Sequence, residues 1–197
     1  MNTKQKGNNF ERDCSRRLSL WWTNGKRDDA IWRSASSGAL TTVGNGRYLA
    51  HTGDFAATDG EAELLFKHVI IEAKRGYNRY SVQDLLDVPQ AALTKSPTYD
   101  MFHKLSAACS VQLKYGMLLW KRDRRELLVF FRDRLYPLGI PPIVPENAIW
   151  INVLCPDGVW MSGVPWSRFK STVSADRLRS LLAPPVALSE STPSTPS

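Results

Sequence analysis

An apolar run that ends in two charged residues is the feature that most constrains this chain. Residues 64–71, LLFKHVII, are rich in branched and aromatic side chains and predict a buried strand. Glu72 and Lys74 follow at its end, where side chains two positions apart share a face. The segment 58–61, TDGE, is typical of a tight turn that folds the extended Gly53-Asp54 segment back against the strand. The sequence therefore predicts that Asp54 reaches Glu72.

Two carboxylates and a lysine at a strand end suit a hard divalent cation. Mg²⁺ prefers oxygen ligands, keeps several waters and commonly takes one or two carboxylates together with substrate phosphate oxygens. Such a cation polarises a phosphoryl oxygen, while Lys74 could orient or deprotonate the attacking water and offset negative charge. This pattern indicates phosphodiester hydrolysis. The structural alternative makes Asp54 a turn residue and Glu72 with Lys74 an exposed ion pair that contributes little stability.

These residues also resemble a known family. Asp54 followed by Glu72-Ala73-Lys74 resembles the D…(D/E)xK signature of the PD-(D/E)XK nuclease superfamily. The segment 6–12, KGNNFER, resembles the first helix of its Holliday-junction-resolvase-like branch, which includes phage and prophage members and in which a glutamate joins the metal site. The resemblance covers residues 5–170. Gly53 stands where a proline often precedes the aspartate.

The resemblance implies a fold, an activity and a set of catalytic residues. The fold is an α/β, restriction-endonuclease-like core with a central mixed β-sheet flanked by helices. The activity is that of a metal-dependent endodeoxyribonuclease that uses Mg²⁺, for which Mn²⁺ could substitute. Asp54, Glu72 and the Ala73 carbonyl would bind the metal, Lys74 would act on the water, and Glu11 would support the metal. Glu11 has a second interpretation, as a first-turn acid that suits the helix dipole.

Basic and polar residues around the predicted site are candidates for DNA contact. Arg75 and Arg79 alternate with aromatic residues, a combination that suits phosphate contact and stacking on exposed bases. Arg33 and Ser34 begin a run of small hydrogen-bond donors that could approach a phosphate backbone. Each of these residues could instead belong to an ordinary solvated surface. The candidates are Arg33, Ser34, Arg75, Arg79, Gln83, Lys121 and Arg122.

Hydrophobic periodicity predicts the remaining elements. A first helix should begin near Asn8 or Asn9 and bury a stripe at three- and four-residue spacing. That stripe is Phe10, Cys14, Leu18, Trp21 and Trp22. Strands are predicted at 30–32, 117–120, 127–131, 149–153 and 159–161, and helices at 101–112, 164–170 and 176–182, with a further helix capped by Ser81.

Length and composition favour one domain and a polyanionic partner. The 197 residues, 43% of them hydrophobic, suffice for a single nuclease-like domain over 1–182, followed by a disordered tail over 183–197 that ends STPSTPS. The 26 Lys and Arg residues outnumber 19 Asp and Glu, which gives a net charge of +7 and a pI near 9.5. Three widely separated cysteines predict neither disulfides nor a zinc cluster.

We expect no membrane partner, because no apolar run approaches the roughly 20 residues that span a bilayer. The expected location is the cytoplasm of a bacterium or phage-infected host, and the expected partner is branched or duplex DNA. The resemblance to dimeric resolvases favours a homodimer. Three functions remain open: a junction-selective endonuclease, a restriction-type or nonspecific nuclease, and an inactive DNA-binding protein of the same fold. The retained Asp54, Glu72 and Lys74 favour a nuclease.

Overall fold

The computed structural model describes residues 3–34, 53–84, 89, 92, 95–132, 147, 149, 151–154 and 160–183. The predicted tail beyond residue 183 and most of the helix expected after Ser81 lie outside these residues. At Ser81 itself, the hydroxyl accepts a hydrogen bond from the amide of Asp84 at 3.3 Å, as expected of a helix cap. Among the described residues, no helix is long and apolar enough to cross a membrane.

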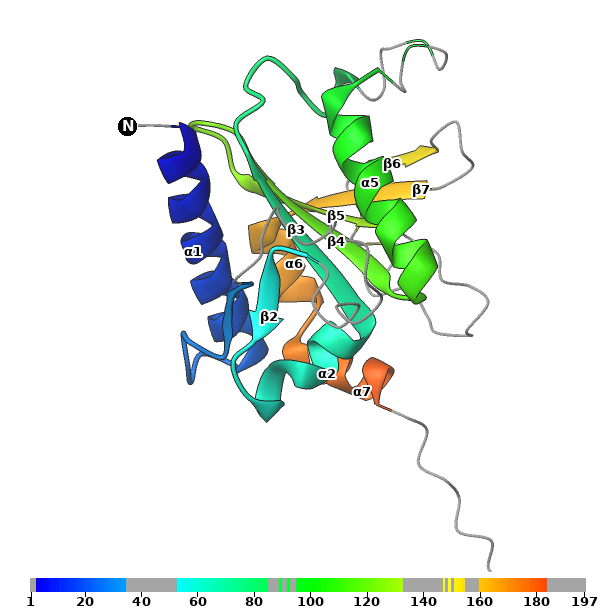
Figure 1. The fold of residues 1–197 in the computed structure, drawn as a ribbon. Coiled ribbons are helices and arrows are strands. Elements are labelled where there is room, and N and C mark those ends of the chain that lie inside the picture. The colour runs from blue at the N-terminus through cyan, green and yellow to red at the C-terminus, as the bar shows by residue number, and fades with distance from the viewer. Residues whose placement is uncertain are drawn as a thin grey trace, which may run out of the picture.

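A five-stranded mixed sheet forms the centre of the molecule (Figure 1). Its strands lie in the order β3-β4-β5-β7-β6, with β3 and β4 parallel and every other neighbouring pair antiparallel. The strands are β3 (Val69–Arg75), β4 (Tyr115–Lys121), β5 (Leu127–Arg132), β6 (Ile151–Leu154) and β7 (Trp160–Pro165). Because β3 and β4 are parallel, their carboxyl ends meet at one edge of the sheet.

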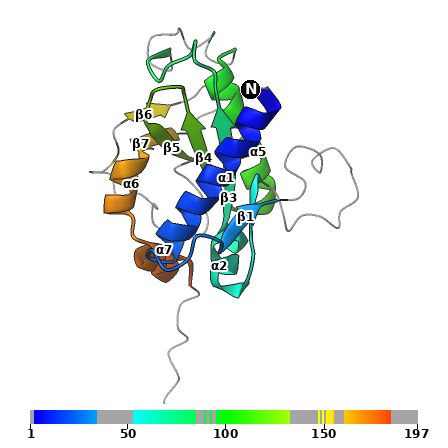
Figure 2. The ribbon, with the colours of Figure 1, turned by 90° about the vertical axis from the view of Figure 1, so that its left-hand side faces the viewer.

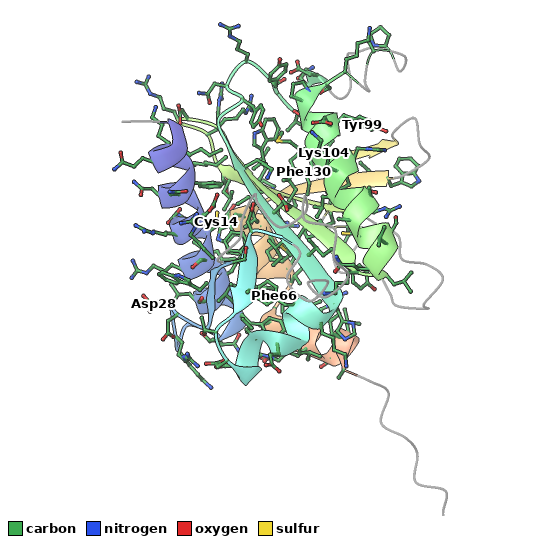
Figure 3. All side chains as sticks on the ribbon, in the orientation of Figure 1. Cys14, Asp28, Phe66, Tyr99, Lys104 and Phe130 are labelled. Atoms are coloured by element: carbon green, nitrogen blue, oxygen red, sulfur yellow. The ribbon has the colours of Figure 1, made fainter. Side chains whose placement is uncertain are left out.

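Helices cover both faces of the sheet, which explains why its strands read as nearly continuous apolar runs. One face packs against α1 (Thr3–Trp22), α2 (Gly60–His68), α6 (Trp166–Thr172) and α7 (Ala175–Leu182). The other face packs against α5 (Pro97–Gln112). Figure 3 shows Cys14 on α1 and Phe130 near α5, and the ring of Phe130 contacts that of Phe102 on α5 edge to face. The α/β fold with a mixed sheet flanked by helices is thus confirmed.

A two-stranded ribbon lies beside α1 and α2 (Figure 2). It pairs β1 (Ile31–Arg33) with β2 (Phe55–Ala57) in antiparallel register. The Ser15 hydroxyl donates to the Ile31 carbonyl at 3.0 Å, and the Ser19 hydroxyl accepts from the Ile31 amide at 2.9 Å. These bonds fasten the ribbon to α1 and orient Arg33 toward the N-terminal half of that helix.

The structure corrects the predicted strand over residues 64–71 and the turn before it. Residues 60–68 form α2, and the strand begins only at Val69. Asp59 caps the helix by accepting from the Glu61 amide, so the TDGE segment starts a helix instead of turning a hairpin. A short apolar run cannot be assigned to helix or strand by periodicity alone. Here the buried Ala62 and Leu65 occupy one side of a helix.

The other predicted elements that the described residues cover are confirmed with shifted boundaries. The first helix starts at Thr3 rather than near Asn8, because Lys and Gln are good helix formers and extend it toward the N-terminus. Its predicted stripe is buried, with Cys14, Leu18 and Trp22 at 0% exposure. The strands predicted at 117–120 and 127–131 form the antiparallel pair β4–β5, and the helices predicted at 164–170 and 176–182 are α6 and α7.

Candidate active site

Asp54 is fixed against the outer edge of β3 by two main-chain contacts. Its amide donates to the Ile71 carbonyl at 3.0 Å, and its Oδ2 accepts from the Ala73 amide at 2.8 Å. Gly53 makes this approach possible, since its φ of +112° is open to glycine and a Cβ there would meet the Ile71 oxygen at 2.8 Å. The Asp54 carboxylate is thereby held at the level of Glu72 to Lys74.

Glu72 and Lys74 extend from the same face of β3, as their spacing predicts. The Lys74 Nζ donates to Glu72 Oε2 at 2.6 Å and lies 3.7 Å from Asp54 Oδ2. All three side chains are largely buried, with 11%, 26% and 31% of the Asp54, Glu72 and Lys74 side chains exposed. The structure therefore brings Asp54, Glu72 and Lys74 into one cluster.

The charges of this cluster favour the binding of a cation in addition to the Lys74 ammonium group. Burial, followed by the charge of Asp54, raises the pKa of Glu72 above its usual value, although Lys74 opposes this rise. For Lys74 burial is the largest influence and lowers the pKa, but the charges of Glu72 and Asp54 together outweigh it. The net effect raises the pKa of Lys74. The two carboxylates thus concentrate negative charge that the ammonium group only partly balances.

The donor set fits a hard divalent cation. Asp54 and Glu72 offer carboxylate oxygens, and Ala73, between Glu72 and Lys74 on β3, offers a main-chain carbonyl. In the described part of the chain, no group of three or more His, Cys, Asp or Glu side chains could hold a metal ion. Two carboxylates without nitrogen or sulfur donors suit Mg²⁺, which keeps several of its waters, better than a transition metal.

Glu11 has a different partner from the one that the resemblance implies. Its Oε2 accepts from the Nε of Arg33 at 2.6 Å, and Arg33 Nη2 also donates to Asn8 at 3.1 Å. Its α1 neighbours Phe10 and Cys14 pack in the core on one face of the sheet. On β3 the side chains of Glu72 and Lys74 share a face with that of Ile70, which packs on the opposite face of the sheet. The structure does not bring Glu11 into the acidic pair, and its part in metal binding stays a prediction.

The predicted DNA contacts fall into two groups. Ser34 is buried, and its hydroxyl donates to the Gly53 carbonyl at 2.9 Å, so it supports the chain that leads into Asp54. Arg33 is held by α1, as described above. Arg79 and Gln83 are exposed, and Arg75, although exposed, donates to Asp123 at 3.4 Å. DNA contact by any of these residues stays a prediction.

Lys121 and Arg122 lie where β4 ends, beside the carboxyl end of β3. Lys121 donates to the Arg125 carbonyl, and Arg122 Nη1 donates to the Tyr80 carbonyl at 2.8 Å. The Arg122 guanidinium also lies over the Trp120 ring, 5.3 Å from its centroid. Lys121 pairs with Arg75 in the parallel register of β3 and β4, and the contact with Tyr80 brings Arg122 to the segment that carries Arg79.

The sequence does not predict one contact at the carboxyl ends of β3 and β4. Asn78 and Asp123 form two reciprocal hydrogen bonds of 3.0 and 2.9 Å, across 45 residues of chain. A lone aspartate within the basic run KRDRR is a signal that the turn needs an acceptor, but nothing in the run identifies Asn78 as the partner.

Comparison with known proteins agrees with this geometry. The model of a family described as "Phage putative PDDEXK endonuclease" matches residues 2–137, which is more than half of the chain. No curated protein and no solved structure matches it. The matched range contains Asp54, Glu72 and Lys74, together with the sheet edge on which they meet. The chain belongs to this family of PDDEXK endonucleases.

Proposed function

We propose that this protein is a Mg²⁺-dependent DNA endonuclease of the Holliday-junction-resolvase-like type. It hydrolyses phosphodiester bonds in branched DNA during recombination, repair or phage DNA processing, and it acts as a homodimer. The single observation that carries the proposal is the cluster of Asp54, Glu72 and Lys74 at the end of β3. Simple DNA binding does not require two buried carboxylates held beside a lysine.

Each residue of the cluster has a distinct task. Asp54, Glu72 and the Ala73 carbonyl would hold Mg²⁺ or Mn²⁺, which would supply Lewis-acid activation of the phosphoryl group. Lys74 orients the attacking water and offsets the negative charge that develops on the phosphate. The Ala73 amide keeps Asp54 in one orientation, so its carboxylate needs little rearrangement when the cation arrives.

The carboxyl ends of β3 and β4 supply the cations that meet the DNA backbone. Arg75, Arg79, Lys121 and Arg122 lie there, and the net charge of +7 favours association with a polyanion. Nothing in these residues distinguishes a junction from a linear duplex. A restriction-type or nonspecific nuclease would use the same cluster, and an inactive binding protein would use only the basic surface.

The test compares cleavage of a labelled four-way junction with that of a linear duplex of the same sequence. Wild type, Lys74→Ala and Lys67→Ala are each incubated with Mg²⁺ and with EDTA. Lys67 is an exposed lysine in the last turn of α2 and serves as the matched control. We expect paired symmetric nicks on the junction alone, abolished by EDTA and by Lys74→Ala but not by Lys67→Ala.

The remaining outcomes separate the alternatives. Equal cutting of the duplex would keep the catalytic assignment and contradict junction selectivity. Cleavage that persists in Lys74→Ala would contradict the assignment of the site. DNA binding without any Mg²⁺-dependent product would identify a binding protein.

A further inference from the structure

Two segments at the carboxyl ends of β3 and β4 are joined into one surface, here called the tip, which comprises residues 76–80 and 122–126. Asn78 and Asp123 exchange two hydrogen bonds, of 3.0 and 2.9 Å. The Gly76 amide donates to the Lys121 carbonyl at 3.0 Å, and Arg122 donates to the Tyr80 carbonyl at 2.8 Å. Three of these four bonds join the first segment to the second, and the fourth joins it to the last residue of β4.

Tyr77, the second residue of the first segment, is exposed. Its side chain is 43% exposed, although its neighbours on both sides are hydrogen-bonded to Lys121 and Asp123. Its φ of +56° lies in the left-handed region, which glycine and asparagine adopt readily and a tyrosine does not. An exposed aromatic ring in a backbone conformation that disfavours it points to a role outside folding.

The tip also carries exposed arginines. Arg79 lies two residues along the same segment and Arg124 on the second, and both are exposed. Within the described parts of the chain, neither guanidinium takes part in an ion pair. The pKa of Asp123 is lowered first by its hydrogen bonds with Asn78 and Arg75 and also by the charge of Lys6, which places the N-terminal part of α1 near the tip. An exposed aromatic ring on a surface that also carries exposed arginines suits a nucleobase and its phosphates better than an apolar protein partner.

The tip is also close to the candidate active site. Gly76 follows Lys74 by two residues, and the loop leaves β3 at the end that carries Glu72 and Lys74 (Figures 1 and 2). Tyr77 is therefore the third residue after the lysine of the catalytic cluster.

We propose that Tyr77 stacks on an unpaired nucleobase next to the cleaved phosphodiester, with Arg79 and Arg124 on the flanking phosphates. The substrate class is then DNA with unpaired nucleotides beside the cut, as at the centre of a branch or the edge of a bubble. This inference rests on the proposed function, because it concerns the substrate of the same site. A fully stacked duplex offers Tyr77 no ring face and is a weaker ligand.

The test measures DNA binding in EDTA, so that cleavage plays no part in it. Fluorescence anisotropy compares a duplex that carries a central unpaired bubble with a fully paired duplex of equal length and equal salt. The variants are Tyr77→Asn, which fits the left-handed backbone, Tyr77→Phe, which keeps the ring, and Trp32→Ala. Trp32 is 50% exposed on β1, away from the tip, and serves as a matched aromatic control.

We expect wild type to bind the bubble more tightly than the duplex. Tyr77→Asn should lose about tenfold in affinity for the bubble, and little for the duplex. Tyr77→Phe and Trp32→Ala should both retain the preference. Thermal unfolding of Tyr77→Asn should be no lower than that of wild type, which separates lost stacking from lost folding.

The inference is overturned if wild type shows no preference for the bubble, or if Tyr77→Asn binds both DNAs as wild type does. It is also overturned if Tyr77→Asn weakens binding to both DNAs equally. Failure of the proposed function looks different. A Tyr77-dependent bubble preference without Mg²⁺-dependent cleavage would contradict the nuclease and retain the stacking surface.

Discussion

Asp54 accepts a hydrogen bond from the Ala73 amide at 2.8 Å, so a carboxylate of the candidate site also satisfies a main-chain donor of β3. The contact separates a structural role from a chemical one, because an asparagine can still accept through its side-chain oxygen. Asp54→Asn should unfold close to wild type, whereas Asp54→Ala leaves a buried amide unpaired and should cost about 1–3 kcal/mol.

The two variants should nevertheless share one defect. Both lose the negative charge, and we expect Mg²⁺-dependent cleavage to fall at least about a hundredfold in each. Urea denaturation and a cleavage assay on the same preparations would check this. Equal stability of the two variants would show that the Ala73 amide finds another acceptor.

Gly53 should be intolerant of any side chain. A Cβ would lie 2.8 Å from the Ile71 oxygen and 3.2 Å from Ile70 Cγ2, at a φ of +112°. We expect Gly53→Ala to destabilise the protein by about 2 kcal/mol or more and to displace Asp54 from β3.

Gly60→Ala is the matched control for this substitution. Gly60 is the first residue of α2, and a Cβ there meets nothing within 4 Å, so the change should be neutral or stabilising. Thermal unfolding of both variants provides the comparison. Similar unfolding temperatures would contradict the close approach at Gly53.

Ser19 should matter more to stability than Ser15, although both hydroxyls reach Ile31. Ser19 alone accepts from the Ile31 amide, at 2.9 Å, while the Ile31 carbonyl receives both hydroxyls. Ser19→Ala leaves a buried donor unpaired and should cost about 1–3 kcal/mol, against about 0.5–1.5 kcal/mol for Ser15→Ala. Denaturant unfolding measures both, and the reverse order would show that the carbonyl contact dominates.

His68 should make stability depend on pH below neutrality. Burial, then the charges of Lys67 and Lys114, lowers the pKa of His68 from 6.5. The unfolded chain therefore takes up a proton more readily than the folded one, so this contribution is present above pH 6.5 and is lost as the pH falls through the folded pKa.

His68→Gln should remove part of this pH dependence. The slope of unfolding free energy against pH between about 7.5 and 5.5 should be shallower for the variant than for wild type. Carboxylates contribute equally to both proteins, so the difference isolates the imidazole. Identical slopes would show that His68 titrates alike in the folded and unfolded states.

Local sequence patterns predict much of the fold, and the predictions that the structure corrects failed for physical reasons. The β4–β5 hairpin was predictable because a charged turn separates two apolar runs, and the shared face of Glu72 and Lys74 follows from strand geometry. The boundary between α2 and β3 was not predictable, because a helix and a strand can both bury the same continuous run of apolar residues. Tertiary packing decides where one ends and the other begins.

The sequence predicts only those parts of the candidate site that are formed by residues close together in the chain. The pairing of Glu11 with Arg33 depends on how α1 crosses β1, and the pairing of Asn78 with Asp123 depends on the parallel register of β3 and β4. Both contacts join residues that are distant in the chain, and neither partner has a pattern that specifies the other. A glutamate on the first helix therefore indicated a metal ligand by resemblance, whereas the structure gives it an arginine partner.

The parallel pairing of β3 with β4 also bears on when the site can form during synthesis. Asp54 docks on β3, but β3 gains its neighbour in the sheet only after residues 115–121 have been made, more than 40 positions later. Contacts across such separations form late, because the intervening chain must first lose its freedom. A nascent chain can have residue 74 outside the ribosome before residue 121 has been made. We expect such a chain to be unable to cut nucleic acid.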